Sequence, residues 1–318
     1  MAKNLAVIAI GGNSLIKDDK RVSVEEQQKA LRETAHHVAD MVEAGWDIAI
    51  GHGNGPQVGF ILRRSEIAAK VEGMHEVPLD VCGADSQGAI GYEFQQALQN
   101  EYHRRGVKKG AATIVTQMLV DRHDPAFQKP SKPIGSFMDE AEAKRREKEM
   151  KWSVVEDAGR GWRRVVPSPM PMRIIELESV KLLLNAGISV ITVGGGGIPV
   201  IDRGNGEFEG TAAVIDKDFA SSLLAQEIGA QLFLIATAVE KVAIHFGKPE
   251  QKWLDKMTLT EAKGYLAEGI HFAKGSMAPK IQAIIWFLEN GGKQALITNP
   301  ENIGRALKGE TGTWIVHE

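Results

Sequence analysis

Hydrophobic residues follow two alternating patterns along this chain: short continuous apolar runs, and longer stretches with apolar residues at helical spacing. Short apolar runs bounded by glycine or polar residues are typical of buried strands. Such strands are expected at 5–10, 47–50, 112–120, 188–193, 232–237 and 294–298, and helices after Ser23 and over 84–105, 175–186, 219–228 and 280–290. Ser23 with Glu26, and Thr258 with Glu261, match the capping-box pattern. Strands that alternate with helices predict an α/β fold with a mainly parallel sheet.

Glycine-rich turns follow three of the predicted strands. These turns are Gly11-Gly12-Asn13, the segment 51–55 and the four consecutive glycines 194–197. Glycine permits positive φ and a close approach of the backbone, and successive N–H groups in such a turn converge on an anion. His52 lies in the second turn, where it serves either as an acid or base or, as we favour, as a residue that holds the loop by hydrogen bonds.

The triplet Asp216-Lys217-Asp218 lies at or near the start of a predicted helix. A lysine there opposes the helix dipole, which favours anions at that end, so its position makes sense beside a phosphate. The alternative is a solvated lysine next to two carboxylates that cap the helix. The four glycines shortly before the triplet favour the phosphate interpretation.

Residues 124–171 differ from the rest of the chain and predict a small inserted subdomain. Six prolines fall in this segment, and Lys132 lies between Pro130 and Pro133 on a stiffened backbone. Residues 139–151 carry charges of both signs, which favours a solvated helix over a nucleic-acid patch. Residues 154–166 resemble a hairpin around a glycine-containing turn.

Composition narrows the class of protein. The chain has 318 residues, 43% hydrophobic and 25% charged, with a formal net charge of −3, so no overall basic field attracts nucleic acid or acidic lipid. Cys82 is the single cysteine, which excludes an internal disulfide and indicates a reducing compartment, the cytoplasm. The sequence contains no apolar run of membrane-spanning length.

The sequence lacks the common catalytic motifs. G-x-x-x-x-G-K-[ST], G-x-G-x-x-G, G-x-S-x-G and H-E-x-x-H are all absent. What remains is amide-rich turns and three lysines in unusual places: Lys132, Lys217 and Lys280, the last directly after Pro279 at a helix start. Phosphoryl transfer requires alignment of the reactants and neutralisation of spreading charge, which such groups supply. Asp218 is a candidate to orient the lysines, and Asp216 to touch a metal or the nucleotide.

The chain resembles the carbamate kinases of the amino acid kinase family over nearly its whole length. The motifs that carry the resemblance occur in family order: AIGGNSL (9–15), GHGNGPQVG (51–59), PLDVCGADSQGAIGY (78–92), DPAFQKPSKPIG (124–135), EDAGRGWRRVVPSP (156–169), GGGGIPV (194–200), AVIDKDFAS (213–221), HFGKP (245–249) and KGSMAPK (274–280). The resemblance implies a three-layer αβα sandwich around a mainly parallel sheet, with a small protruding subdomain, assembled as a homodimer.

The resemblance also implies the reaction ATP + carbamate ⇌ ADP + carbamoyl phosphate with Mg²⁺ held mainly through the nucleotide phosphates, run toward ATP in arginine or purine/allantoin catabolism. It implies an N-terminal lobe (1–230, including 124–171) for the carbamoyl phosphate and a C-terminal lobe (231–318) for the nucleotide, with 194–218 shared. The implied catalytic residues are Lys132, Lys217, Asp218 and Lys280. Gly11, Gly12, Asn13, Gly53 and Asn54 would bind carbamoyl phosphate, and Gly195, Gly196, Asp216, Phe246, Lys248 and Met277 the nucleotide.

The sequence departs from the family pattern at three positions. Ala212, Ala238 and Lys274 stand where many relatives have Glu, Gly and Pro. These changes bear on nucleotide fit more than on transfer itself. They leave two alternatives open: a kinase of another small acid on the same fold, and a non-catalytic protein that binds phosphate or nucleotide.

Overall fold

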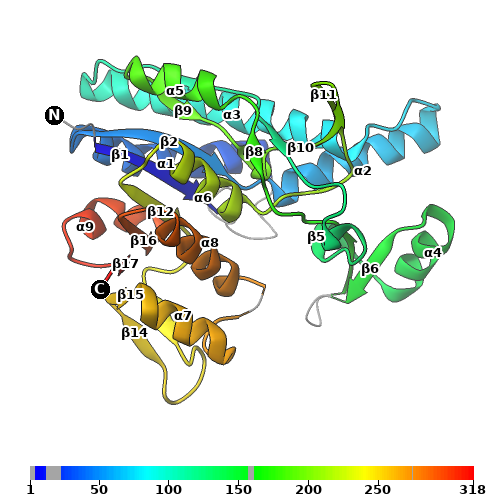
Figure 1. The fold of residues 1–318 in the computed structure, drawn as a ribbon. Helices are drawn as coiled ribbons and strands as arrows, with labels where there is room; N and C mark the ends of the chain where they lie inside the picture. Colours follow the sequence, from blue (N-terminus) through cyan, green and yellow to red (C-terminus); the bar gives the residue numbers. More distant parts are fainter. Residues whose placement is uncertain (1–3, 12–22, 157–160, 274) are drawn as a thin grey trace.

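An eight-stranded sheet forms the centre of the molecule in this computed structural model, which describes residues 4–11, 23–156, 161–273 and 275–318 (Figure 1). The strands, in spatial order, are β15 (Lys256–Thr258), β17 (Thr313–Val316), β16 (Gln294–Thr298), β12 (Leu232–Ala236), β1 (Asn4–Ile10), β2 (Trp46–His52), β9 (Ser189–Ile191) and β3 (Ala111–Thr113). Every neighbouring pair is parallel except β16 and β17. The predicted mainly parallel sheet is therefore confirmed.

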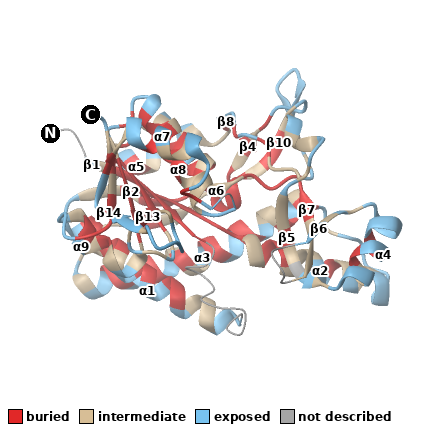
Figure 2. Cartoon of the chain, turned by 90° about the horizontal axis from the view of Figure 1, so that it is seen from below, coloured by how far each residue is buried: buried red, intermediate tan, exposed pale blue. Residues whose placement is uncertain are grey.

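Helices cover both faces of this sheet. One layer holds α1 (Val24–Glu43), α3 (Leu79–Arg105) and α9 (Ile303–Leu307), and the other α5 (Leu177–Asn185), α6 (Lys217–Glu227), α7 (Leu259–Glu268) and α8 (Met277–Glu289). Successive side chains of a strand point to opposite faces of the sheet. In β1, Ala6 and Ile8 therefore pack in the core beneath α1, α3 and α9, and Val7 and Ala9 pack in the core beneath α5 to α8. Figure 2 shows the strands buried between helices whose outer sides are exposed. The predicted three-layer sandwich is confirmed.

The strand expected over 112–120 is wrong, because two short strands of different sheets occupy this segment. β3 ends at Thr113, and β4 (Gln117–Leu119) belongs to a second sheet with β10 (Ile198–Gly204), β11 (Glu207–Gly210) and β8 (Arg173–Ile174). Between them, the side chain of Gln87 bonds both the backbone N–H and the C=O of Thr116, and this C=O also accepts from the Ile198 amide at the start of β10. A buried side chain thus satisfies the backbone where the chain leaves the large sheet.

The predicted protruding subdomain is confirmed and projects from the sandwich beside α2 (Gly55–Glu72) (Figure 1). It consists of α4 (Glu140–Met150) and an antiparallel sheet of β5 (Lys132–Met138), β7 (Trp162–Val166) and β6 (Ser153–Glu156). The paired strands β6 and β7 also confirm the predicted hairpin. Asp139 caps α4, and Glu142 pairs with Arg145 and Arg146. The mixed charges of α4 therefore balance one another, as a solvated helix requires.

Several helix boundaries differ from those predicted. The helices expected from 84 and 280 begin at Leu79 and Met277, and Pro279 is tolerated because it lies in the first turn of its helix. The expected caps are confirmed: Ser23 accepts a hydrogen bond from the Glu26 amide, and Thr258 forms a full capping box with Glu261.

The division into two lobes near residue 230 stays a prediction. β12 begins just after that position and pairs with β1. A separate hairpin of β13 (Val242–Ile244) and β14 (Lys252–Leu254) follows it. Within the described part of the chain, no helix is both long enough and apolar enough for a membrane span.

Candidate active site

The N-terminus of α6 carries the predicted charged triplet. Asp216 is the N-cap residue, and its Oδ1 accepts a hydrogen bond of 2.9 Å from the Asp218 amide. Lys217 and Asp218 occupy the first turn, where the Asp218 side chain is only 3% exposed. The capping interpretation of Asp216 is therefore correct, but it is not the whole role of the triplet.

Three lysines from three separate elements converge on these two carboxylates. Lys132, the first residue of β5, places its Nζ 2.6 Å from Asp216 Oδ2. Lys217 Nζ lies 2.7 Å from Asp218 Oδ1, and Lys280 Nζ of α8 lies 2.9 Å from Asp218 Oδ2. We call Lys132, Asp216, Lys217, Asp218 and Lys280 the lysine cluster. Lys217 is thus a mostly buried, ion-paired side chain and not a solvated one.

The pKa shifts show how strongly the cluster depends on these pairs. Burial alone would raise the pKa of both carboxyl groups, but Lys132 and Lys217 hold the pKa of Asp216 below its usual range, and Lys217 and Lys280 do the same for Asp218. Burial opposes the charge of Lys217, yet Asp218 and Asp216 raise its pKa. Burial and the neighbouring Lys217 lower the pKa of Lys280.

The cluster has an excess of positive charge. Three ammonium groups face two carboxylates, and the positive end of the α6 dipole adds to the same side. All four carboxylate oxygens already accept hydrogen bonds from the lysines or from the helix cap. An incoming anion therefore meets lysines whose charge is only partly neutralised.

The glycine turns end neighbouring strands at one edge of the large sheet. The Gly11 amide donates to Ala236 O at the end of β12, and the Gly53 amide donates to Ile10 O at the end of β1. Gly12 and Asn13 lie outside the described residues. The carboxyl ends of parallel strands are where open α/β sheets place their ligands, and the described glycines lie there.

The four-glycine turn joins this edge to the lysine cluster. In the 3₁₀ turn Gly194–Gly196, a Cβ on Gly195 would lie 2.2 Å from Asn54 Nδ2, and one on Gly196 would lie 2.4 Å from the carbonyl oxygen of Ile215. Gly195 and Gly196 have φ of 64° and 95°. Only glycine permits both the positive φ and the contacts. The turn is thus packed between Asn54, at the start of α2, and the residue before Asp216.

Two polar residues of α3 outside the predicted site, Ser86 and Gln87, hold this arrangement together. Asn54 Nδ2 donates to Ser86 Oγ at 2.7 Å, and Gln87 Nε2 donates to Gly194 O at 3.0 Å. Gln87 is 1% exposed and shares the buried face of α3 with Ile90 and Phe94. The sequence signal for this role is the polar Gln87 on a helix face that is otherwise apolar. A buried amide must find hydrogen-bond partners, so such a residue indicates a structural contact.

His52 supports the loop-holding interpretation. Its side chain is 1% exposed, and its Nδ1 lies 3.0 Å from Gly53 O, which only accepts, so Nδ1 carries the proton. Burial lowers the pKa of His52 to about 4, and the hydrogen bond to Gly53 opposes this only in part. The ring is therefore neutral at physiological pH and orients the turn.

Of the three residues expected near adenosine, Met277 alone belongs to a helix of the lysine cluster. Met277 opens α8, one turn before Lys280. Phe246 and Lys248 lie in the β13–β14 turn, where Phe246 is 63% exposed and its ring faces Trp253. Their place at the nucleotide stays a prediction.

Known proteins resemble the chain over its full length. The model of the amino acid kinase family matches residues 4–299. The carbamate kinase of Thermococcus kodakarensis is 50% identical over 313 residues, which are 98% of this chain and 99% of the relative. The carbamate kinase-like protein YahI of Escherichia coli is 51% identical over 315 residues, 99% of each chain.

A solved structure agrees with these relatives. The carbamate kinase from Giardia lamblia bound to AMP-PNP superposes with a TM-score of 0.91 at 40% identity, over 100% of this chain and 99% of that one. The chain belongs to the amino acid kinase family. It is a phosphotransferase, and the lysine cluster is its candidate active site.

A backbone contact places Lys132 of this kinase. A Cβ on Gly59 of α2 would lie 2.4 Å from the Cα of Gly135, three residues after Lys132 in β5. Gly135 has φ of 73°. The backbones of α2 and β5 are therefore in direct contact at Gly59 and Gly135. This contact positions the strand that begins with Lys132.

We predict that Gly59→Ala impairs phosphoryl transfer. The added methyl group forces β5 away from α2, and Lys132 then moves from its place beside Asp216. A catalytic electrostatic group that is displaced typically costs about 10²-fold in kcat. Steady-state kinetics measure this, with Gly264→Ala as control, because a Cβ on Gly264 meets no atom within 4 Å. A wild-type kcat for Gly59→Ala would show that the contact does not position Lys132.

Proposed function

We propose that this chain is a carbamate kinase, which transfers a phosphoryl group reversibly between ATP and carbamate to give ADP and carbamoyl phosphate. The observation that carries the proposal is the convergence of Lys132, Lys217 and Lys280 on Asp216 and Asp218 at the start of α6. The carbamate kinases of Thermococcus kodakarensis and Clostridium perfringens, 50% and 48% identical over almost the whole chain, support the choice of carbamate.

The proposed mechanism relies on positioning and charge. The transferring phosphoryl group spreads negative charge over its oxygens, and fixed ammonium groups stabilise that charge without reorganisation. Lys132 approaches from the protruding subdomain, and Lys217 and Lys280 from the side of α6 and α8. Asp218 bonds both of the latter amines and so orients them. Carbamate is already an anion, so the reaction needs no general base.

The remaining residues are proposed to bind the two substrates. Gly11, Gly12, Asn13, Gly53 and Asn54 bind carbamoyl phosphate at the strand ends. Gly195 and Gly196 bring their backbone to the nucleotide phosphates, Asp216 holds Lys132 beside them, and Phe246, Lys248 and Met277 contact the adenosine. The packing of the four-glycine turn against Asn54 and Ile215 supports a common site for both substrates.

Magnesium is proposed to enter with the nucleotide. Each oxygen of Asp216 and Asp218 already accepts a hydrogen bond from a lysine or from the helix cap, and the three ammonium groups beside them disfavour a metal cation there. Among the described residues, no group of three or more His, Cys, Asp and Glu side chains has a metal-binding arrangement. Mg²⁺ is commonly held through substrate phosphates with few protein ligands. When bound, it would neutralise phosphate charge beside the lysines.

The cellular setting is also proposed. The enzyme works in the cytoplasm, toward ATP synthesis in arginine or purine/allantoin catabolism. The carbamoyl phosphate site lies in the lobe 1–230, and the nucleotide site is shared with 231–318.

Transfer to another small acid is the second candidate function, because two Escherichia coli relatives at 50–51% identity are named only carbamate kinase-like. Ala212 and Ala238, two of the departures from the family pattern, are exposed.

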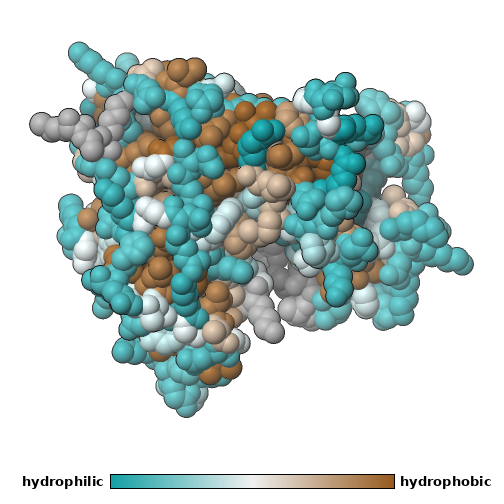
Figure 3. Space-filling view, viewed as in Figure 1, coloured by the Kyte–Doolittle hydropathy of each residue, from teal (hydrophilic) through white to brown (hydrophobic). Residues whose placement is uncertain are grey.

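A homodimer is proposed as the working form. Figure 3 shows hydrophobic side chains gathered on the face where α5, α6 and β8 lie in Figure 1, whereas hydrophilic side chains cover the subdomain tip. Leu182 of α5 is 70% exposed and Met172, beside β8, is 56% exposed. Exposed apolar surface of this kind marks protein interfaces.

The proposed reaction predicts ATP formation from ADP, Mg²⁺ and carbamoyl phosphate. Lys217→Ala removes the buried ammonium group that stabilises the transferring phosphoryl group, so kcat falls by about 10²–10³-fold. Coupled ATP detection measures both, and Lys181→Ala is the control, because Lys181 pairs only on the surface of α5. A folded protein without ATP formation would reject carbamate kinase activity. ATP-dependent phosphorylation of another acid in an acceptor panel would then establish the second candidate, and nucleotide binding without any turnover would establish a non-catalytic protein.

Asp218→Asn is expected to change the pH dependence of kcat. Burial and Lys217 already lower the pKa of Lys280, and Asp218 opposes them. Loss of the carboxylate lowers the pKa of Lys280 further, so the amine loses its proton at lower pH. The alkaline limb of the kcat profile therefore moves to lower pH. Asp255→Asn, at an exposed partner of Lys241, should leave the limb in place. An unmoved limb in Asp218→Asn would contradict the assigned role of Lys280.

Leu182→Lys tests the proposed dimer. A charge buried in the dimer interface weakens association, because the ammonium group loses its water without gaining a partner. The variant should therefore dissociate to monomers at concentrations where the wild type is dimeric. Light scattering coupled to size exclusion measures the mass, with Val71→Lys in α2 as an equally exposed apolar control. A wild-type monomer, or a variant that keeps the dimer mass, would argue against this face.

A further inference from the structure

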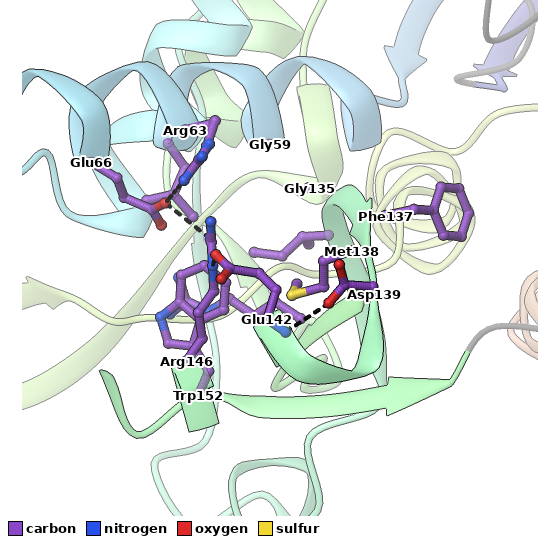
Figure 4. Close-up of a pocket in the computed structure, with 13 residues that line it drawn as sticks. Gly59, Arg63, Glu66, Gly135, Phe137, Met138, Asp139, Glu142, Arg146 and Trp152 are labelled. Carbon is purple, nitrogen blue, oxygen red and sulfur yellow. Dashed lines mark hydrogen bonds and ion pairs between the residues drawn. The ribbon is translucent and has the colours of Figure 1, made fainter. Parts of the chain in front are cut away.

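A cavity lies between α2 and the protruding subdomain. Its volume is about 370 Å³, and Figure 4 shows its lining side chains extending from α2 on one side and from β5 and α4 on the other. Leu62, Ile134, Met138 and Trp152 supply its apolar part. None of the lysine cluster lines it. This volume is within the range of small-molecule sites. Three arginines and three carboxylates line the cavity beside its apolar part.

The carboxylates of the cavity are already engaged. Glu142 Oε1 accepts a hydrogen bond of 2.6 Å from Arg146, and Asp139 caps α4. Glu66 Oε2 lies 3.4 Å from Arg146 Nη1 and 3.5 Å from Arg63 Nη1. Arg63 and Arg146 thus have acidic partners, and each acidic side chain has a basic or backbone partner.

Arg164 differs from the other two arginines of the cavity. Its guanidinium lies over the Trp152 ring, 4.6 Å from the centroid, and it forms no hydrogen bond or ion pair with any described residue. The group is half-buried, and this burial lowers its pKa, because water is withdrawn from the charge. Arginine stays protonated at all physiological pH, so a partly desolvated cation, stacked on Trp152, lines the cavity with no hydrogen-bond acceptor among the described residues.

The chemistry of the cavity selects the kind of ligand. A guanidinium edge matches two oxygens of a planar carboxylate through a pair of parallel hydrogen bonds. Leu62, Ile134 and Met138 line the same cavity and favour an apolar body on the same molecule, which an inorganic phosphate lacks. We propose that this cavity is a binding site for a small carboxylate with an apolar body, anchored by Arg164.

Such a ligand would join two parts of the molecule. Leu62 belongs to α2, whereas Ile134 belongs to β5, the strand that begins with Lys132. An occupant that contacts both would stabilise the docking of the subdomain on the sandwich. Because it binds only the folded arrangement, it also raises the melting temperature. This inference does not depend on which acid the kinase phosphorylates.

The direct test uses 4-fluorobenzoate as probe and ¹⁹F NMR as readout on the full chain. We expect saturable binding by the wild type and a rise in melting temperature at about 10 mM probe. Arg164→Gln should weaken binding at least about tenfold, since it removes the charged hydrogen bonds. Arg122→Gln, at an exposed arginine elsewhere, and Lys217→Ala, in the lysine cluster, should bind the probe like the wild type.

A second variant separates loss of the site from loss of the fold. Leu62→Trp fills the cavity and leaves Arg164 in place, so it should also abolish binding while the far-ultraviolet circular dichroism stays native. Absence of wild-type binding, equal binding by Arg164→Gln, or loss of binding in Lys217→Ala would overturn the proposal. Arg164-dependent binding of inorganic phosphate without binding of the benzoate would show that the assigned ligand class is wrong.

Discussion

The candidate site depends on one electrostatic arrangement, the sharing of Asp216 and Asp218 among three lysines. Buried ammonium groups are costly unless they are paired, and like charges this close repel. The cap of α6 holds the two carboxylates next to each other, because Asp216 accepts the amide of Asp218. Lys132, Lys217 and Lys280 can therefore approach one another with their charge only partly neutralised. That residual charge is what a transferring phosphoryl group requires.

Close backbone packing brings the parts of this arrangement together. The four-glycine turn fits between Asn54 and Ile215, and Gly59 meets Gly135 where the subdomain docks. Gln87 bonds the turn at Gly194 and the segment at Thr116, so one buried amide links two segments far apart in the sequence. The sandwich thus supplies rigid strand ends, while β5 brings a lysine from outside it.

The layers of the fold were predictable because they follow from local patterns. The apolar runs at 5–10 and 232–237 are buried strands, and the caps at Ser23 and Thr258 start the helices as expected. The prediction of one strand over 112–120 is wrong, because the chain breaks where Gln87 bonds Thr116, and these residues are 29 apart in sequence. Apolar periodicity does not contain the partners that a side chain finds at long range.

The site was predictable in its residue types but not in its pairing. Lysines at a helix start and after a proline indicated an anion, and the family resemblance grouped them. The expected orienting role of Asp218 agrees with its bonds to two amines. The sequence did not show that Asp216 would bind Lys132, since that contact spans 84 residues. Nor did the sequence indicate the proposed binding role of Arg164. That role depends on the absence of a hydrogen-bond acceptor for its guanidinium among the described residues.

The most direct measurement is a crystal structure with ADP, Mg²⁺ and aluminium fluoride, which mimics the phosphoryl group in flight. The account predicts that the fluoride lies beside the four-glycine turn, with the Nζ atoms of Lys132, Lys217 and Lys280 each within about 3 Å of it or of the adjoining phosphate oxygens. Aluminium fluoride bound elsewhere, or any of the three amines turned away from it, would contradict the account.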